Sequence, residues 1–381
     1  MDVDEPLTLL GGISPAIFMR RHWQKKPLLV RQALPGVTPP LSRAALFALA
    51  GSQDVESRLV VRTDSTWQVR AGPLARRVLP PVSQPGWTLL VQGLDLHVPA
   101  AHRLLTLFRF VPAARLDDLM VSWASPGGGV GPHVDAYDVF LVQVQGRRRW
   151  QVGKMKNAAL VAGAPLKLLR HFDPTQEWLL EAGDMLYLPP GWGHDGVADG
   201  ADCMTCSVGF RAPAAGELAR DLLMRLADEG DGQSDVLTPA AAALYRDPKQ
   251  PATTIPAFLP EGLVAFARAA LERQLADPDA LARVFGEMLT EPKARVWFDR
   301  GAPRRPGAVR LDARTRMLYD GRHVFINGEA LRAAGRDAVL MRRLADTRTL
   351  GAVDCARLSP PAAALLDEWA AAGWVRQDAA C

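Results

Sequence analysis

The sequence predicts a mixed α and β fold in three parts: a β jelly roll over residues 1–211, a helical region over 212–302 and a winged-helix-like module over 303–381. Short apolar runs separated by glycine, proline or polar turns fill residues 116–211, and this spacing is typical of a sandwich or barrel. The composition then changes to Ala, Leu, Arg and Glu at helical spacing, as in ELARDLLMRLADEG. A jelly roll is favoured because the space between its two sheets can enclose a buried metal and ligand.

The N-terminal part carries the run FMRRHWQKKPLLVR. Phe18 and Trp23 flank a basic helical turn, and Pro27 ends this turn before an extended apolar run. We expect a docking segment whose aromatic side chains cap the core. Short helical patterns then alternate with strand patterns. His97 and His102 lie in this part without a glycine loop before them, so both are expected to be structural.

The last part begins with TRMLYDGRHVFING, which predicts a hairpin around Asp320 and Gly321. Helices are expected over 329–346 and 359–372, followed by a short apolar end, GWVRQ. A strand pair with helices and a final strand is compatible with a winged-helix-like module. The last helix is acidic, with Asp367 and no basic residue, so direct nucleic-acid binding is not expected.

The composition is that of a globular protein, with 48% hydrophobic and 23% charged residues. No apolar run approaches the roughly 20 residues that cross a bilayer, and the start, MDVDEPLTLLGGISP, is acidic where a secretory signal would be basic. Four cysteines do not make a disulfide framework, which agrees with a reducing compartment. We therefore expect a cytoplasmic protein without membrane association. The net charge of +4 weakly favours an anionic neighbour such as RNA but does not establish one.

Three side chains are predicted to hold a metal ion. The stretch GGGVGPHVDAYDVFLVQVQGRRRWQV contains His133 and Asp135, which share one face if the chain there is a strand. His194 follows the apolar run and turn GDMLYLPPGWG, and we take it as the third ligand. Two imidazoles and one carboxylate leave coordination positions open, as in non-haem Fe(II) oxygenases. The alternative for His133 is a loop histidine bonded to a neighbouring carbonyl.

Arg148 is the residue that favours a particular kind of ligand. On a return strand after Gly146, Arg148 shares a face with the apolar residues Trp150 and Val152, so its guanidinium is expected to point inward. A buried guanidinium is costly unless it meets an anion, and a carboxylate can accept two parallel hydrogen bonds from it. A metal site facing such an arginine suggests a chelating acid with a far carboxylate, the form of 2-oxoglutarate. The alternative is an internal salt bridge to an Asp or Glu.

The run CMTCSVGF predicts a strand with one polar and one apolar face. Thr205 and Ser207 fall on the polar face, where they can reach a bound ligand or fill space. Cys203 and Cys206 are three apart and point to opposite faces, which argues against a zinc or redox pair. The glycine loop over 127–131 lacks a Gly-Lys-Ser/Thr ending and leads into a strand, so nucleotide binding is not expected.

With these residues in hand, the chain resembles the Jumonji C (JmjC, cupin-like) 2-oxoglutarate oxygenases, which have a double-stranded β-helix. Within them it is similar to the bacterial ribosomal oxygenases that hydroxylate an arginine of a large-subunit (50S) ribosomal protein. The resemblance is carried by FMRRHWQKKPLLVR, PGGGVGPHVDAYDVFLVQVQGRRRW and GDMLYLPPGWGH in that order, and by the fifteen-residue step from His133 to Arg148. It covers the first 210 residues well, whereas the later parts match in order and size.

The resemblance implies a mechanism and a set of partners. Fe(II) would be held by His133, Asp135 and His194, with 2-oxoglutarate and O2 as cosubstrates and Arg148 on the distal carboxylate. An arginine target also needs negative charge, for which Asp118 is the candidate. Tyr137 and Met120 would line the substrate channel. The helical region would form a homodimer, and the final domain would be winged-helix-like.

Other functions remain open at this level. The same centre is compatible with N-methyl demethylation of protein or with hydroxylation of RNA. A metal-binding cupin without oxygenase activity is a third possibility. Cupins of that kind commonly use His-x-His with a glutamate, so Asp135 and Arg148 argue against it.

Overall fold

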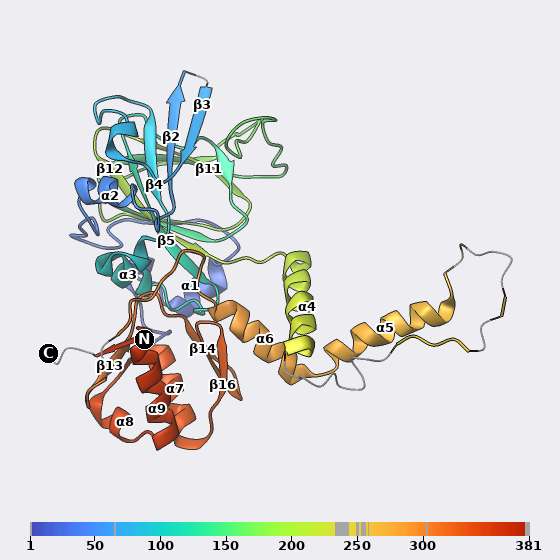
Figure 1. Ribbon diagram of the computed structural model, residues 1–381. Helices are drawn as coiled ribbons and strands as arrows, with labels where there is room; N and C mark the ends of the chain where they lie inside the picture. Colours follow the sequence, from blue (N-terminus) through green and yellow to red (C-terminus); the bar gives the residue numbers. More distant parts are fainter. Residues whose placement is uncertain are drawn as a thin grey trace. The chain divides into compact units, whose positions relative to one another are not determined.

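The computed structural model of the chain divides into two compact units (Figure 1). It describes residues 2–64, 66–232, 244–248, 251–252, 257, 259–301 and 304–377. The first unit comprises Met1–Ala212 and Lys293–Phe298, and the second comprises Pro213–Pro292 and Asp299–Cys381. Among the described helices, none is long and apolar enough to cross a membrane.

The first unit is built on β-strands. Its helices are α1 (Pro15–Arg21), α2 (Arg43–Leu49) and α3 (Pro99–Thr106), with short 3-10 turns at Thr8–Leu10, Arg76–Val78 and Leu94–Leu96. Its strands are β1 (Leu28–Val30), β2 (Ser57–Thr63), β3 (Thr66–Ala71), β4 (Trp87–Val91), β5 (Leu116–Ala124), β6 (His133–Val134), β7 (Val139–Gln145), β8 (Arg148–Lys154), β9 (Gln176–Leu180), β10 (Met185–Leu188), β11 (Trp192–Ala198) and β12 (Cys203–Phe210).

These strands form two antiparallel sheets. The larger sheet has the order β1-β10-β7-β12-β5-β4-β2-β3, and the smaller has the order β6-β11-β8-β9. Side chains from both sheets line one cavity, so the sheets face each other around it. This arrangement confirms the predicted jelly roll.

Alternation along two strands places their side chains as predicted. On β12, Met204, Cys206 and Val208 belong to the main hydrophobic core, whereas Thr205 and Ser207 line the cavity. Cys203 and Cys206 therefore point to opposite faces of β12, as predicted. Alternation on β8 likewise buries Arg148, Trp150 and Val152 and leaves Arg149 exposed.

The N-terminal segment docks on the main core through its aromatic residues, as predicted. Ser14 caps α1 by accepting a hydrogen bond from the Ile17 N–H. Phe18 is fully buried, with its ring edge-on to that of Tyr187 at a centroid distance of 4.9 Å. Burying such a side chain stabilises a fold by about 1.5–3 kcal/mol. Trp23 packs edge-on against Phe210 and closes the core on this side.

The second unit combines helices with two small sheets. Its helices are α4 (Ala215–Gly232), α5 (Glu261–Leu275), α6 (Pro278–Thr290), α7 (Gly335–Thr347), α8 (Ala352–Ala356) and α9 (Pro360–Ala371). Its strands are β13 (Val309–Leu311), β14 (Met317–Tyr319), β15 (His323–Ile326), β16 (Glu329–Arg332), β17 (Thr349–Leu350) and β18 (Val375–Gln377). The sheets have the orders β17-β13-β18 and β14-β15-β16.

The predicted helix over 329–346 is wrong at its start. Residues 329–332 form strand β16, which pairs with β15 in a second hairpin. Asn327 and Gly328 join the two strands with φ angles of 48° and 92°, a left-handed turn that these residue types favour. Helix α7 begins only at Gly335. The predicted hairpin at Asp320 and Gly321 is confirmed by the pairing of β14 with β15.

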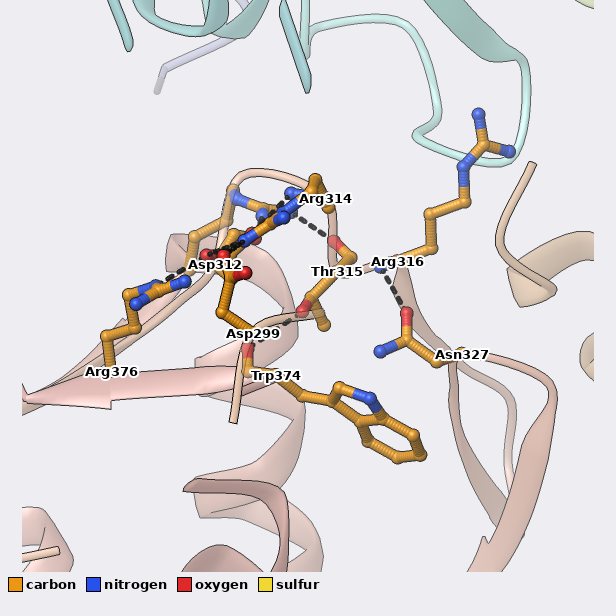
Figure 2. Close-up of polar contacts among 9 residues, drawn as sticks. Asp299, Asp312, Arg314, Thr315, Arg316, Asn327, Trp374 and Arg376 are labelled. Carbon is orange, nitrogen blue, oxygen red and sulfur yellow. Dashed lines mark hydrogen bonds and ion pairs between the residues drawn. The ribbon is translucent and has the colours of Figure 1, made fainter. Parts of the chain in front are cut away.

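A cluster of polar side chains links the chain after β13 to β18 in the small sheet (Figure 2). The Asp312 carboxylate accepts hydrogen bonds from Arg314 Nε at 2.8 Å and Arg376 Nε at 2.5 Å. Burial opposes ionisation of Asp312, but hydrogen bonds from these two arginines outweigh it and lower its pKa to about 2. Thr315 Oγ1 donates to the Trp374 carbonyl at 2.7 Å, which ties the turn after β13 to the chain entering β18.

Candidate active site

The pairing of β6 with β11 brings the three predicted metal ligands together. His133 and His194 are direct cross-strand neighbours, and their ring centroids are 4.2 Å apart. Asp135 follows β6 by one residue, and its Oδ2 lies 3.7 Å from His194 Nε2. One ligand atom from each residue lies within 4.8 Å of the other two. A single metal ion between these atoms would therefore meet all three side chains.

Backbone carbonyls orient both imidazoles. His133 Nδ1 lies 2.9 Å from the Gly131 carbonyl oxygen, and His194 Nδ1 lies 3.0 Å from the Trp192 carbonyl oxygen. With Nδ1 donating to the carbonyl, Nε2 of each ring keeps its lone pair for a cation. The loop-histidine alternative for His133 is thus compatible with metal binding, because different ring nitrogens serve the two contacts.

Burial keeps the site in the charge state that a metal requires. Burial and the neighbouring His133 lower the pKa of His194 to about 3, so its ring is neutral at ordinary pH. Burial raises the pKa of the Asp135 carboxyl, while His133, Tyr137 and Lys167 act in the opposite direction. A bound cation would favour the carboxylate far more strongly than these neighbours do.

Arg148 points into the same cavity, as its strand parity predicts. Its side chain is 3% exposed, and Nε donates to Cys203 Sγ at 3.4 Å. Nη2 is buried, and no described residue forms a hydrogen bond with it. Within the described part of the chain, Arg148 forms no ion pair with a carboxylate, so the internal salt bridge is not found. A buried guanidinium with one free N–H group fits the far carboxylate of a bound dicarboxylic acid.

All nine predicted site residues line one cavity of about 630 Å³. They are His133, Asp135, His194, Arg148, Thr205, Ser207, Asp118, Met120 and Tyr137. Tyr137 lies in a bend after the end of β6, so strand alternation alone does not place it at the cavity.

A buried polar residue that contacts the cavity wall also escaped prediction from the sequence. Gln143 is fully buried on β7, and its Oε1 accepts a hydrogen bond from Thr205 Oγ1 at 2.8 Å. Its Nε2 donates to Cys203 Sγ at 3.4 Å, the same sulfur that Arg148 contacts. The available signal was a glutamine inside the apolar run VFLVQVQ, since an inward polar residue needs a partner.

The far end of the cavity is acidic. Asp118 is buried, and its Oδ2 accepts hydrogen bonds from the Gly93 N–H at 3.0 Å and Gln92 Nε2 at 2.9 Å. Burial raises the pKa of Asp118, and Lys293 acts against this rise. Asp117 also lines this cavity, and Lys293 forms ion pairs with both aspartates from a second cleft; neither Asp117 nor Lys293 was predicted from the sequence.

Comparison with known proteins identifies the family. The JmjC domain family matches residues 103–218, and the ROXA-like winged helix family matches residues 273–376. The ribosomal protein uL16 3-hydroxylase of Escherichia coli (strain K12) is 35% identical over 341 residues, which cover 84% of this chain and 86% of that protein. The chain belongs to the JmjC ribosomal oxygenases. The JmjC match contains the triad and Arg148, as the resemblance implied.

Other relatives of this JmjC ribosomal oxygenase agree. A probable ribosomal oxygenase from Haemophilus influenzae is 41% identical over 206 residues, 53% of this chain and 50% of that protein. An X-ray structure of E. coli YcfD matches with a TM-score of 0.83 at 31% identity, covering 95% of this chain and 97% of that one. The E. coli ribosomal oxygenase in complex with cobalt and 2-oxoglutarate matches with a TM-score of 0.79, 31% identity and the same coverage.

The winged-helix match confirms the predicted class of the C-terminal part of this ribosomal oxygenase. The match begins within α5, upstream of the boundary predicted between residues 302 and 303. That boundary lies outside the described residues. The three-part division therefore stays a prediction.

Proposed function

We propose that this protein is an Fe(II)- and 2-oxoglutarate-dependent oxygenase that hydroxylates an arginine side chain of the large-subunit ribosomal protein uL16. One observation carries the proposal: the triad shares a cavity with Arg148, whose Nη2 has no hydrogen-bond partner among the described residues. The E. coli uL16 3-hydroxylase and the E. coli structure with cobalt and 2-oxoglutarate support it.

The residues present fit the proposed iron and cosubstrate. His133, Asp135 and His194 would hold the iron, and Arg148 would bind the distal carboxylate of 2-oxoglutarate, with Thr205 and Ser207 beside it. When bound, iron with 2-oxoglutarate and O2 supplies the oxidation that places a hydroxyl on a C–H and leaves succinate and carbon dioxide. The protein's own contribution is to orient the reactants and exclude water within a largely buried cavity.

The substrate end of the cavity supports a cationic target. Asp118 is a buried carboxylate that lines the cavity with Met120 and Tyr137. Burial raises the pKa of the Tyr137 hydroxyl, and the Asp135 and Asp118 carboxylates raise it further. A guanidinium entering here would meet negative charge in a site of low polarity, where such an interaction is strong.

Mass spectrometry of a reconstituted reaction tests the proposal. Purified enzyme with Fe(II), 2-oxoglutarate and O2 is incubated with unmodified uL16, and succinate is measured alongside the intact mass of uL16. We expect succinate and one added oxygen atom that fragmentation assigns to an arginine. Loss of a methyl group from a methylated substrate would instead favour a demethylase, and absence of succinate would favour a non-catalytic cupin.

Assembly as a homodimer through the helical region is part of the same proposal. Apolar side chains of α4 and α5 are exposed in the single chain, including Met224 at 61% and Leu271 at 58%. Exposed apolar surface of this kind is typical of an association site. Light scattering of the purified protein tests the dimer, and a monomer mass at micromolar concentration would contradict it.

A further inference from the structure

Lys293 places a positive charge at the acidic end of the active-site cavity. It begins the segment Lys293–Phe298, which belongs to the first unit although the chain on both sides of it belongs to the second. Its Nζ lies 2.9 Å from Asp117 Oδ1 and 3.5 Å from Asp118 Oδ2. A residue remote in sequence thus supplies a cation to the two carboxylates that a cationic substrate would use.

A β-bulge presents both carboxylates to the cavity. The pairing of β5 with β12 shifts between Gly209 and Phe210, which pair with Asp118 and Leu116, so Asp117 is the extra residue. Adjacent residues on a regular strand would point to opposite faces. Here Asp117 and Asp118 both line the cavity of the metal triad.

The lysine reaches this pair from a second cleft. A cavity of about 450 Å³ is lined by Lys293, Arg295, Asp118 and neighbouring residues of the first unit. Asp118 lines both cavities, and its side chain is only 4% exposed. The Lys293 side chain is 31% exposed, so the ammonium is partly hydrated while it contacts the buried carboxylate of Asp118 and the partly exposed carboxylate of Asp117.

The charges hold Lys293 in its protonated form. Burial lowers the pKa of Lys293, but Asp118, Asp117 and Asp95 together outweigh it and raise the pKa above its ordinary value. The acidic pair therefore has a resident ammonium before any substrate arrives. Any incoming cation must share or displace it.

We propose that Lys293 is a specificity-determining residue that makes the acidic end of the cavity select a guanidinium over an ammonium group. The inference rests on the proposed function and adds the residue responsible for discrimination between arginine and lysine. Lys293 acts as a tethered competitor. Its Nζ is confined near the carboxylates at an effective concentration in the millimolar range or above.

The two kinds of side chain differ in what they gain by displacing it. When a substrate lysine displaces Lys293, one ammonium replaces another, so the substrate gains little binding free energy. Unlike Lys293, the substrate lysine is not held near the carboxylates by the chain. A substrate arginine presents a planar fork that makes two parallel hydrogen bonds to one carboxylate, which a point-charge ammonium cannot reproduce. A substrate arginine can bind Asp118 while Lys293 stays 2.9 Å from Asp117 Oδ1, whereas a substrate lysine has to displace Lys293. The resident lysine thus penalises lysine substrates more than arginine substrates.

The test compares two peptides that differ at one position. Each spans the uL16 arginine that the wild-type enzyme hydroxylates, and one carries lysine there. Binding is measured under nitrogen on enzyme loaded with Mn(II) and 2-oxoglutarate, so that no turnover contributes. We expect the wild type to bind the arginine peptide at least about tenfold more tightly than the lysine peptide. In Lys293→Met this ratio should fall by about fivefold or more, mainly because the lysine peptide binds more tightly.

Three further variants sharpen the comparison. Lys293→Gln keeps the length and polarity without the charge and should behave like Lys293→Met, which covers the case in which the methionine variant does not fold. Lys293→Arg should keep the ratio and weaken both peptides, because a tethered guanidinium competes more strongly. Arg295→Met removes one charge from the same segment and should leave the ratio unchanged.

The outcomes separate the two proposals. A wild-type enzyme that neither hydroxylates uL16 nor binds the arginine peptide overturns both the proposed function and this inference. A wild-type enzyme that does both, with the same ratio in Lys293→Met and Lys293→Gln, overturns the inference alone. Equal weakening of both peptides in these variants would show a purely structural role and would also overturn it.

Discussion

Arg148 donates from Nε to Cys203 Sγ at 3.4 Å, while its buried Nη2 has no hydrogen-bond partner in the part of the chain that the structure describes. The sulfur holds one edge of the guanidinium and leaves the other directed at the cavity. A weak acceptor is sufficient to orient the side chain without neutralising it. The charge therefore remains available to a ligand.

Replacing Arg148 by Ala should raise the KM for 2-oxoglutarate by roughly 30-fold or more, because a buried carboxylate would lose its charged partner. Metal affinity should change little, since Arg148 touches none of the three predicted ligands in any described contact. Succinate production against 2-oxoglutarate concentration, with a Co(II) titration in parallel, measures both. Arg149→Ala, an exposed neighbour, is the control. An unchanged KM would return Arg148 to a structural role.

Replacing Asp135 by Ala should abolish turnover and weaken metal binding by at least about 100-fold, given that losing even an outer-shell partner costs 10–100-fold. The fold should persist, because Asp135 lies outside β6 and outside the hydrophobic clusters. Co(II) titration and circular dichroism check the two parts. Asp173→Ala, at an exposed acid, should leave metal affinity unchanged. Retained activity in Asp135→Ala would remove this residue from the triad.

Replacing Asp95 by Asn should stabilise the protein relative to wild type, and this gain should be larger at high pH than at low pH. Burial raises the pKa of Asp95 to about 7, well above the value of an unfolded chain, so ionisation costs folding free energy between about pH 4 and pH 7. The asparagine keeps an acceptor for the Leu119 N–H, which Asp95 Oδ1 binds at 2.8 Å. We expect the variant to gain about 4 kcal/mol at pH 8 and little at pH 4.

Urea unfolding of Asp95→Asn and wild type at both pH values measures this gain. The exposed Asp54→Asn serves as the control and should show no pH-dependent difference. A variant of Asp95 with equal or lower stability at pH 8 contradicts the prediction.

Replacing Asp312 by Asn should destabilise the second unit by about 2 kcal/mol at neutral pH. Burial raises the Asp312 pKa, but hydrogen bonds from Arg314 and Arg376 outweigh burial and lower this pKa to about 2. The ionised carboxylate therefore contributes stability above about pH 4. That contribution is lost as the pH falls toward 2. Asp367→Asn, at a more exposed ion pair with Arg304, should cost much less.

Thermal unfolding from pH 2 to pH 7 checks the Asp312 prediction. The difference between wild type and Asp312→Asn should shrink steadily below pH 4. A difference that is constant over the whole range would mean that the carboxylate charge is not the source of the effect.

Side-chain alternation along single strands accounts for most of the site residues that could be predicted from the sequence. Whether Arg148 points inward follows from its parity with Trp150 and Val152, which depends on the neighbouring residues alone. The same reasoning placed Thr205 and Ser207 at the cavity. Strand β11 was missed because WGHDGVA contains two glycines and little of the usual strand composition. Its pairing with β6 and β8 compensates for this weak propensity.

By itself the sequence determined which residues could carry the chemistry and which side of their strands they occupy, since strand alternation is a local property. Tertiary structure decided the distances between them. The 4.2 Å separation of the His133 and His194 rings comes from the pairing of two strands that are far apart in sequence. The ion pair of Lys293 with Asp117 depends on a bulge and on a short segment that belongs to the first unit although the chain on both sides of it belongs to the second. Such contacts arise from the packing of the whole unit, which no short window of sequence contains.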